Sequence, residues 1–176
     1  MEDDIIIKSP GVFQKYIDLS KETGIQHFNF ALHGPNNKDK KGIKSPRATV
    51  DSLSLYPNCV GAFSYYSADC LKLAGLMDEA FFNAFEHVEH TYRIIKLGMH
   101  PDFWWFADLA NADDYLDDIP WTKESSTISS RFDHDELVFT ALVEFHKKHG
   151  VNLFSIDIPT QDKVVETLTE IKRQRK

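Results

Sequence analysis

The chain has 176 residues and a mass of 20.2 kDa, which suits one domain with a hydrophobic core, and 42% of its residues are hydrophobic. Its 20 Lys and Arg residues against 27 Asp and Glu residues give a net charge of −7, which disfavours binding to nucleic acid or to an anionic membrane surface. No apolar run approaches the roughly 20 residues that span a bilayer, and acidic residues follow Met1. We therefore expect a soluble, cytoplasmic protein with no membrane span.

The first residues predict a strand, a helix and a second strand. Residues 4–7 have the pattern of a short buried strand. Ser9 as N-cap and Pro10 at the first helical position predict a helix that ends at Gly24. The alternation of apolar and polar residues over 25–32 then predicts a strand.

The middle of the chain contains a loop followed by alternating elements. Residues 36–47 lack periodicity and predict a surface loop, whereas 60–66 predict a strand. Ser67 has the position of an N-cap for a short helix that Gly75 ends. Apolar residues recur at helical spacing over 84–97, which predicts a longer helix.

The last third of the chain is mainly helical in its pattern. The aromatic residues 103–106 predict a strand, and periodicity predicts helices over 135–149 and 161–173. We therefore expect a mixed α/β part over residues 1–118 and a mainly helical C-terminal extension, packed on it, over 119–176.

Acidic residues at the start of the chain are candidates for a cation site. In a strand, the side chains of Glu2 and Asp4 would point to the same side, and Mg²⁺ or Mn²⁺ prefers carboxylate oxygens. The alternative is a solvated, charged chain terminus.

The most densely polar segment is 78–98. On a helix, Glu86, Glu89 and His90 would share one face, and Glu89 and Arg93 have the spacing of an ion pair. Such a face is either part of a functional site or a solvated surface.

This segment resembles the acceptor-side signature of the inverting, family-2 nucleotide-sugar glycosyltransferases of the GT-A fold. That signature runs D-E-x-F, E-D-x-D, R and G, and the residues at matching spacings here are Asp78, Glu79, Phe81, Glu86, Glu89, Arg93 and Gly98. Glu2-Asp3-Asp4 resembles the family's upstream D-x-D motif, and Gly61-Ala62-Phe63 resembles its small-residue acceptor loop.

The resemblance implies a GT-A-like, Rossmann-related mixed sheet flanked by helices, in which the N-terminal nucleotide-binding half of the family is missing. It implies a metal-assisted sugar transfer, with inversion, from a nucleotide-sugar donor to a saccharide acceptor. The isolated chain is expected to show little turnover because the donor-binding half is absent. Acceptor binding would fall to Gly61, Ala62, Asp78, Glu79, Glu89 and Arg93.

One position departs from the family in a way that affects the chemistry. The family's catalytic aspartate is replaced by His87, which can still accept a proton from a sugar hydroxyl near neutral pH, and Glu86 is the other candidate base. Asp4 and Glu2 are the candidate ligands of Mn²⁺ or Mg²⁺. His100 is a further metal ligand or a surface histidine, and Trp105 either stacks on a sugar or belongs to the core.

Two other functions remain open. The departure at His87 is also consistent with a non-catalytic carbohydrate-binding or interaction module. A metal-dependent hydrolase built on His87 and His90 is disfavoured because the order H-E-x-x-H is absent. Unpaired edge strands would permit a homo-oligomer.

Overall fold

A computed structural model describes residues 4–33, 38–39, 42–43, 46–58, 61–119, 127–128 and 130–174. Its strands are β1 (Ile5–Ile7), β2 (His27–Asn29), β3 (Lys38–Asp39), β4 (Gly42–Ile43), β5 (Ala48–Val50), β6 (Leu53–Tyr56), β7 (Ser64–Tyr66), β8 (Phe106–Leu109) and β9 (Leu116–Asp118). Its α-helices are α1 (Val12–Thr23), α3 (Ala68–Ala74), α4 (Glu86–Lys96), α5 (His134–His149) and α6 (Gln161–Gln174). Two short 3₁₀ turns, η1 (Ala112–Asp114) and η2 (Leu153–Ser155), complete the described elements.

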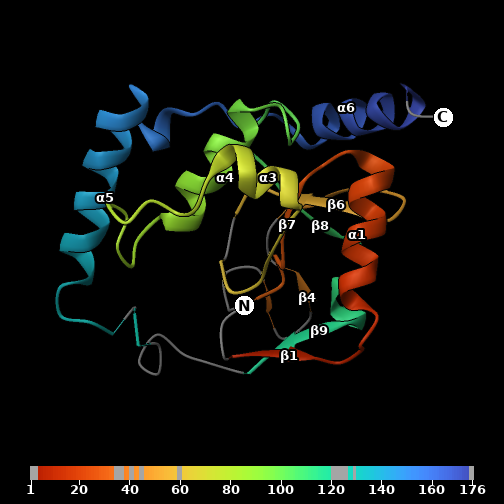
Figure 1. The fold of residues 1–176 in the computed structure, drawn as a ribbon, viewed down its shortest axis with the longest axis horizontal. Helices are drawn as coiled ribbons and strands as arrows, with labels where there is room; N and C mark the ends of the chain where they lie inside the picture. Colours follow the sequence, from red (N-terminus) through yellow and green to blue (C-terminus); the bar gives the residue numbers. More distant parts are fainter. Residues whose placement is uncertain are drawn as a thin grey trace.

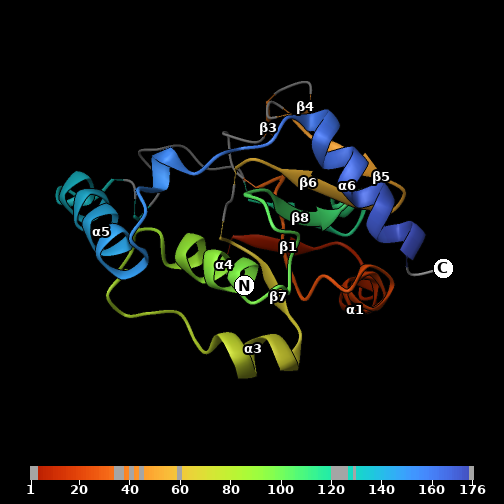
Figure 2. The same ribbon diagram turned by 90° about the horizontal axis from the view of Figure 1, so that it is seen from above.

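The fold is mixed α/β and is built on small antiparallel sheets. Strands β5, β6 and β8 form one sheet, and β1–β9, β2–β7 and β3–β4 form pairs. All these described pairs are antiparallel, which differs from the expected mixed sheet. Figures 1 and 2 show α1 and α6 beside the sheets at one end of the molecule and α5 at the other.

Two of the helix ends predicted from the sequence agree with the structure, and the N-cap predicted for the first helix does not. Gly24 takes the left-handed conformation, with φ 74°, and ends α1 as expected. The N-cap of α1 is Gly11 and not Ser9, which accepts the Val12 N–H with its backbone carbonyl at 3.3 Å. The Ser67 side chain accepts the Cys70 N–H at 3.0 Å and caps α3 as expected.

Strand positions differ from the expectations where tertiary pairing sets them. The aromatic strand was predicted over 103–106, but β8 begins at Phe106, which pairs with Tyr56 of β6. The strand over 4–7 was expected to be buried, but in β1 only Ile5 is buried, and Ile6 and Ile7 are exposed. The expected loop over 36–47 includes the β3–β4 pair.

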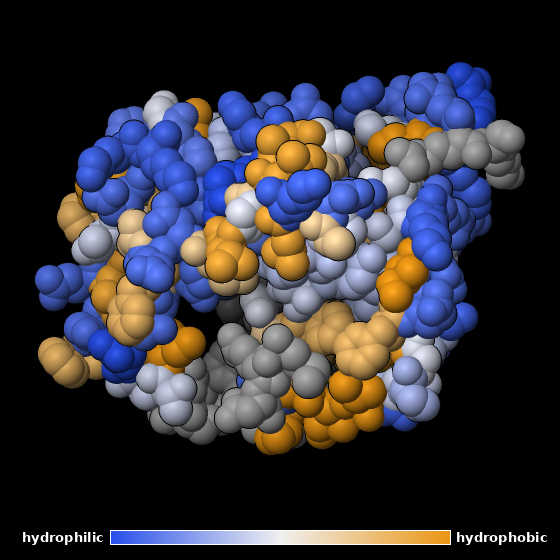
Figure 3. All heavy atoms as spheres, viewed as in Figure 1, coloured by the Kyte–Doolittle hydropathy of each residue, from blue (hydrophilic) through white to orange (hydrophobic). Residues whose placement is uncertain are grey.

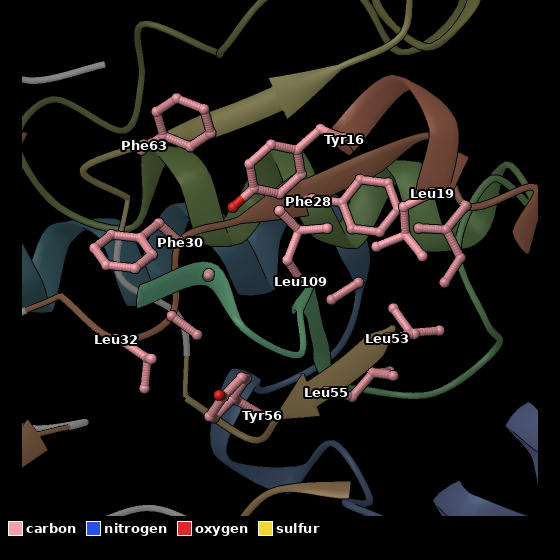
Figure 4. Close-up of a cluster of buried hydrophobic side chains, with 14 of the residues drawn as sticks. Tyr16, Leu19, Phe28, Phe30, Leu32, Leu53, Leu55, Tyr56, Phe63 and Leu109 are labelled. Carbon is pink, nitrogen blue, oxygen red and sulfur yellow. The ribbon is translucent and has the colours of Figure 1, made fainter. Parts of the chain in front are cut away.

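The main core lies between α1, α6 and the strands. Figure 4 shows buried side chains from the helix, the strands and the segments that join them: Tyr16, Leu19, Phe28, Phe30, Leu32, Leu53, Leu55, Tyr56, Phe63 and Leu109. The carboxylate of Asp108 is fully buried in this core, where it accepts the Tyr16 hydroxyl at 2.7 Å and the Ala31 N–H at 2.9 Å. Burial raises the pKa of Asp108 to about 7.

Both C-terminal helices pack on the rest of the chain. Val164 and Leu168 of α6 are buried in the main core, beside β5. Ala141 and Phe145 of α5 form a second, smaller cluster with the loop residues Phe81 and Ala84.

A third contact joins α3 to α4, where Cys70 is buried against Ala74 and Ile94. The other cysteine, Cys59, lies outside the described residues. Figure 3 shows apolar side chains on this face over α3 and below it over β1, where Leu73 and Ile6 are exposed. Within the described ranges no helix has the length and apolar character needed to cross a membrane.

Candidate functional site

The first turn of α4 brings three of the predicted site residues together. Glu86 and His87 open this helix, and His87 Nδ1 lies 3.5 Å from Glu86 Oε1. The imidazole of His87 also lies against Gly61, since a Cβ built on Gly61 would stand 2.6 Å from His87 Nδ1 and 2.7 Å from its Cγ. Only a glycine fits beneath the ring in this position.

The Glu86 carboxylate is suited to accept a hydrogen bond. Its Oε2 atom is buried and has no hydrogen-bond partner among the described residues. Burial raises the pKa of Glu86, but the neighbouring His87 outweighs burial, so the pKa lies below its ordinary value. An ionised carboxylate at a helix N-terminus is favoured, and the Glu86 side chain, which is 30% exposed, lines the hollow described next.

An open hollow of about 560 Å³ begins beside Glu86. It is lined by Met77, Asp78, Glu79, Phe81, Phe82, Asn83 and Glu86. Phe82 is 63% exposed, so the hollow offers an aromatic face next to carboxylate oxygens. That combination suits a polyhydroxylated ligand, whose ring stacks on the aromatic face while its hydroxyls donate to the carboxylates.

The backbone that leads into α4 is strained. Asn83 and Phe85 have φ values of 56° and 62°, in the left-handed region that side chains other than glycine rarely adopt. The helix therefore begins at Glu86, two residues later than expected from the periodicity. This turn orients Glu86 and His87 relative to the hollow.

Glu89 and Arg93 interact with protein groups. Glu89 is fully buried, and its carboxylate accepts two bonds from Arg93 Nε, at 2.9 and 3.0 Å. Lys148 Nζ and His149 Nε2 lie 2.9 and 3.0 Å from the same carboxylate. Arg93 also donates to the carbonyls of Ala74, the last residue of α3, and of Leu76 beyond it.

Lys148 connects this buried carboxylate to the hollow. Its ammonium lies 2.6 Å from Asp78 Oδ2, and the hydrogen bond from Lys148 lowers the pKa of Asp78. Neither Lys148 nor His149 was predicted as a site residue. The basic cluster at the end of α5 is visible in the sequence, but its pairing with Glu89 depends on the tertiary fold.

Asp4 lies in a different part of the molecule from α4. Its Oδ2 is 3.4 Å from His33 Nε2, and His33 Nδ1 is 3.5 Å from Asp118 Oδ2. Asp4 Oδ1 is buried and has no hydrogen-bond partner among the described residues. Glu2 lies outside those residues.

Asp4 and His100 each keep one buried polar atom without a hydrogen-bond partner among the described residues, Oδ1 and Nε2 respectively. Mg²⁺ or Mn²⁺ commonly uses one or two protein carboxylates and completes its shell with water and phosphate, so an unpaired carboxylate oxygen at Asp4 is a suitable donor. His100 is 95% enclosed, with Nδ1 3.2 Å from the Pro101 carbonyl. Over the described ranges, no three His, Cys, Asp or Glu side chains are close enough to hold a metal together.

His27 belongs to a buried polar network next to α4. Its Nδ1 donates to the Tyr65 carbonyl at 2.9 Å, which leaves Nε2 to accept from the Thr91 hydroxyl at 2.8 Å. His90 lies nearby, with a ring-centroid distance of 6.5 Å from His27, and its Nε2 donates to the Gly75 carbonyl. These contacts belong to neutral imidazoles in the interior.

Ala62 and Trp105 are enclosed as well. Ala62 is 1% exposed and Trp105 is 3% exposed, and both belong to the main core. In this structure the exposed aromatic group of the hollow is Phe82, which sequence reasoning did not select.

Comparisons of the chain with known protein families, with curated proteins and with solved structures gave no match. The functional argument therefore depends on the geometry around Glu86, His87 and the hollow.

Proposed function

We propose that this chain binds a saccharide acceptor and belongs to an inverting nucleotide-sugar glycosyltransferase. The observation that carries the proposal is the contact of His87 with Gly61 beside the unpaired Glu86 oxygen, at the edge of the hollow. Residue 61 is separated in sequence from the adjacent residues 86 and 87, and the resemblance assigns all three to the acceptor side.

In this proposal the acceptor occupies the hollow with one sugar ring against Phe82. Its hydroxyls donate to Asp78, Glu79 or Glu86. As the acceptor oxygen forms a bond to the anomeric carbon, the bond from that carbon to the diphosphate breaks, and Glu86 or His87 accepts the hydroxyl proton. The cation that the resemblance implies would be held at Asp4, in a different part of the molecule from α4, so the proton transfer to Glu86 or His87 does not depend on it.

Chemical-shift titrations of the chain with cellohexaose, laminarihexaose and chitohexaose test the acceptor site. We expect at least one oligosaccharide to shift the amide signals of residues 77–86 and Gly61, and we expect Glu86→Gln to weaken that binding about tenfold or more. Glu144→Gln, at a distant exposed carboxylate paired with Lys147, is the matched control and should bind normally. The absence of shifts with every oligosaccharide would contradict a saccharide site.

A second candidate function is a carbohydrate-binding module without catalysis. It is favoured by the departure from the family at residue 87, where a histidine stands in place of the catalytic aspartate. Titration with Mn²⁺ and uridine diphosphate separates the two candidates. Shifts near Asp4 that Asp4→Asn removes support the transferase. Saccharide binding that does not depend on Mn²⁺ and persists in His87→Ala supports the carbohydrate-binding module.

A further inference from the structure

The C-terminal end of α5 makes the principal polar contacts to the segment that forms the hollow. Lys148 reaches both Asp78, at 2.6 Å, and the buried Glu89, at 2.9 Å, and its ammonium lies 5.8 Å from the centre of the Phe81 ring. His149 adds a contact of 3.0 Å to Glu89. Figure 2 shows the loop between α3 and α4 running toward α5 before it returns to α4.

The contacts of Lys148 fix both ends of this loop. At its start, Asp78 also accepts the Ala80 N–H through its other oxygen, at 2.9 Å, and the Phe81 N–H bonds to the Asp78 carbonyl at 3.0 Å. At its end, Glu89 lies one helical turn after Glu86, so its position sets the first turn of α4. The apolar contacts of Phe81 with Ala141 and Phe145 hold the same loop against α5.

The loop between these two ends requires external support. The left-handed conformations of Asn83 and Phe85 cost free energy, and such conformations persist only where the surroundings enforce them. Burial alone would lower the pKa of Lys148, but the carboxylates of Asp78 and Glu89 outweigh it and raise the pKa above its ordinary value. The ammonium is therefore charged and binds both carboxylates at neutral pH.

We infer that Lys148 and His149 are positioning residues for the candidate site: Lys148 joins Asp78 to Glu89 and His149 adds a contact to Glu89, so together they hold the strained loop, and through it they place His87 against Gly61 and Glu86 beside His87. For its functional meaning this inference rests on the proposed function. The role of α5 is then to shape the acceptor hollow from outside, although it contributes no residue to the lining of the hollow.

The test compares Lys148→Met, Lys148→Arg and His149→Leu with Lys147→Met. Lys147 is the matched control because it neighbours Lys148 but pairs with Glu144 on the surface of α5. The readouts are the amide signal of Gly61, the ring signals of His87 and the hydrogen-exchange rates of the Ala80 and Phe81 amides. The nearest atoms to a Cβ on Gly61 all belong to the His87 ring, so the Gly61 signal reports the position of that ring.

We expect Lys148→Met to shift the Gly61 and His87 signals and to raise amide exchange at Ala80 and Phe81 at least tenfold. Lys148→Arg keeps the positive charge, so its signals and exchange rates should stay close to those of the unmodified protein. Lys147→Met should change neither the signals nor the exchange rates. If Lys148→Met fails to fold, His149→Leu provides the same comparison, because leucine cannot donate to Glu89 and the Lys148 bridge is kept. Unchanged Gly61 and His87 signals in the folded variants would overturn the inference. These readouts need no saccharide, so their outcome is independent of whether the acceptor proposal holds.

Discussion

The imidazole of His87 lies so close to Gly61 that a Cβ on the glycine would stand 2.6 Å from the ring nitrogen Nδ1. The two residues come from different parts of the chain, and their contact defines one wall of the site. Glu86 Oε1 lies 3.5 Å from the same nitrogen. The position of the ring is therefore set by a carboxylate and by the absence of a side chain at residue 61.

Gly61→Ala should force His87 away from its place. The overpacking is expected to cost about 1–3 kcal/mol of unfolding free energy, measured by urea denaturation. The His87 ring signals should shift in the same variant. Gly11→Ala is the matched control because its Cβ would meet only Ser9 Oγ at 3.9 Å. A Gly61→Ala protein with unchanged stability and unchanged His87 signals would show that the ring does not occupy this position.

Glu89→Ala should be strongly destabilising. It would leave Arg93, Lys148 and His149 without the buried carboxylate that they share, and loss of one partner of a buried ion pair costs about 3–5 kcal/mol. Thermal and urea denaturation measure the effect. Glu144→Ala breaks an exposed pair and should cost about 0.5 kcal/mol or less. Similar stabilities for the two variants would rule out the buried network.

Acidification should destabilise the fold through its buried histidines. Burial lowers the pKa of His27 to about 3 and of His100 to about 4, from an ordinary value of 6.5. The unfolded chain therefore takes up protons first as the pH falls. The stability from these neutral imidazoles is complete above pH 6.5 and is lost toward pH 4, at about 1.4 kcal/mol per pH unit for each histidine.

The ionisation of Asp108 changes the stability in the opposite direction over the same pH range. The pKa of Asp108 in the folded protein, about 7, exceeds its ordinary value of 3.8. The stability that the protonated carboxyl contributes is therefore complete below pH 3.8 and is lost as the pH rises toward 7. Urea denaturation at several pH values should show a net loss of about 1.4 kcal/mol per unit between pH 6.5 and 4. His100→Gln should flatten this dependence and Asp108→Asn should steepen it. A stability that rises on acidification would contradict the assignment.

Leu168→Ala should show that α6 belongs to the core. Leu168 is 2% exposed and packs in the main cluster, so its truncation should cost about 2–5 kcal/mol. The measurement is the unfolding free energy in urea. Glu170→Ala, on an exposed part of the same helix, should change it by less than about 0.5 kcal/mol. Equal effects of the two substitutions would mean that α6 does not pack on β5.

Features set by neighbouring residues could be predicted from the sequence. The Ser67 cap of α3 and the glycine that ends α1 depend on local backbone chemistry, and both were predicted correctly. The spacing of Glu89 and Arg93 likewise predicted their ion pair. In each of these cases the interacting groups lie within about one helical turn.

Features set by distant residues could not be predicted in the same way. The register of β8 depends on pairing with β6, which moves the strand three residues beyond its predicted start at Phe103. The burial of Glu89 depends on Lys148 and His149, about 60 residues further along the chain. The left-handed conformation at Phe85 could not be predicted because the residue is not a glycine.

The thiol of Cys70 provides an internal reporter of the contact between α3 and α4. Burial between α3 and α4 raises its pKa to about 11, so at neutral pH it is a protonated thiol and is protected from alkylating reagents. Separation of α3 from α4 would expose and activate it. In a Cys59→Ser background, the rate of Cys70 alkylation therefore measures how often the helix that carries Glu86 and His87 loses its neighbour.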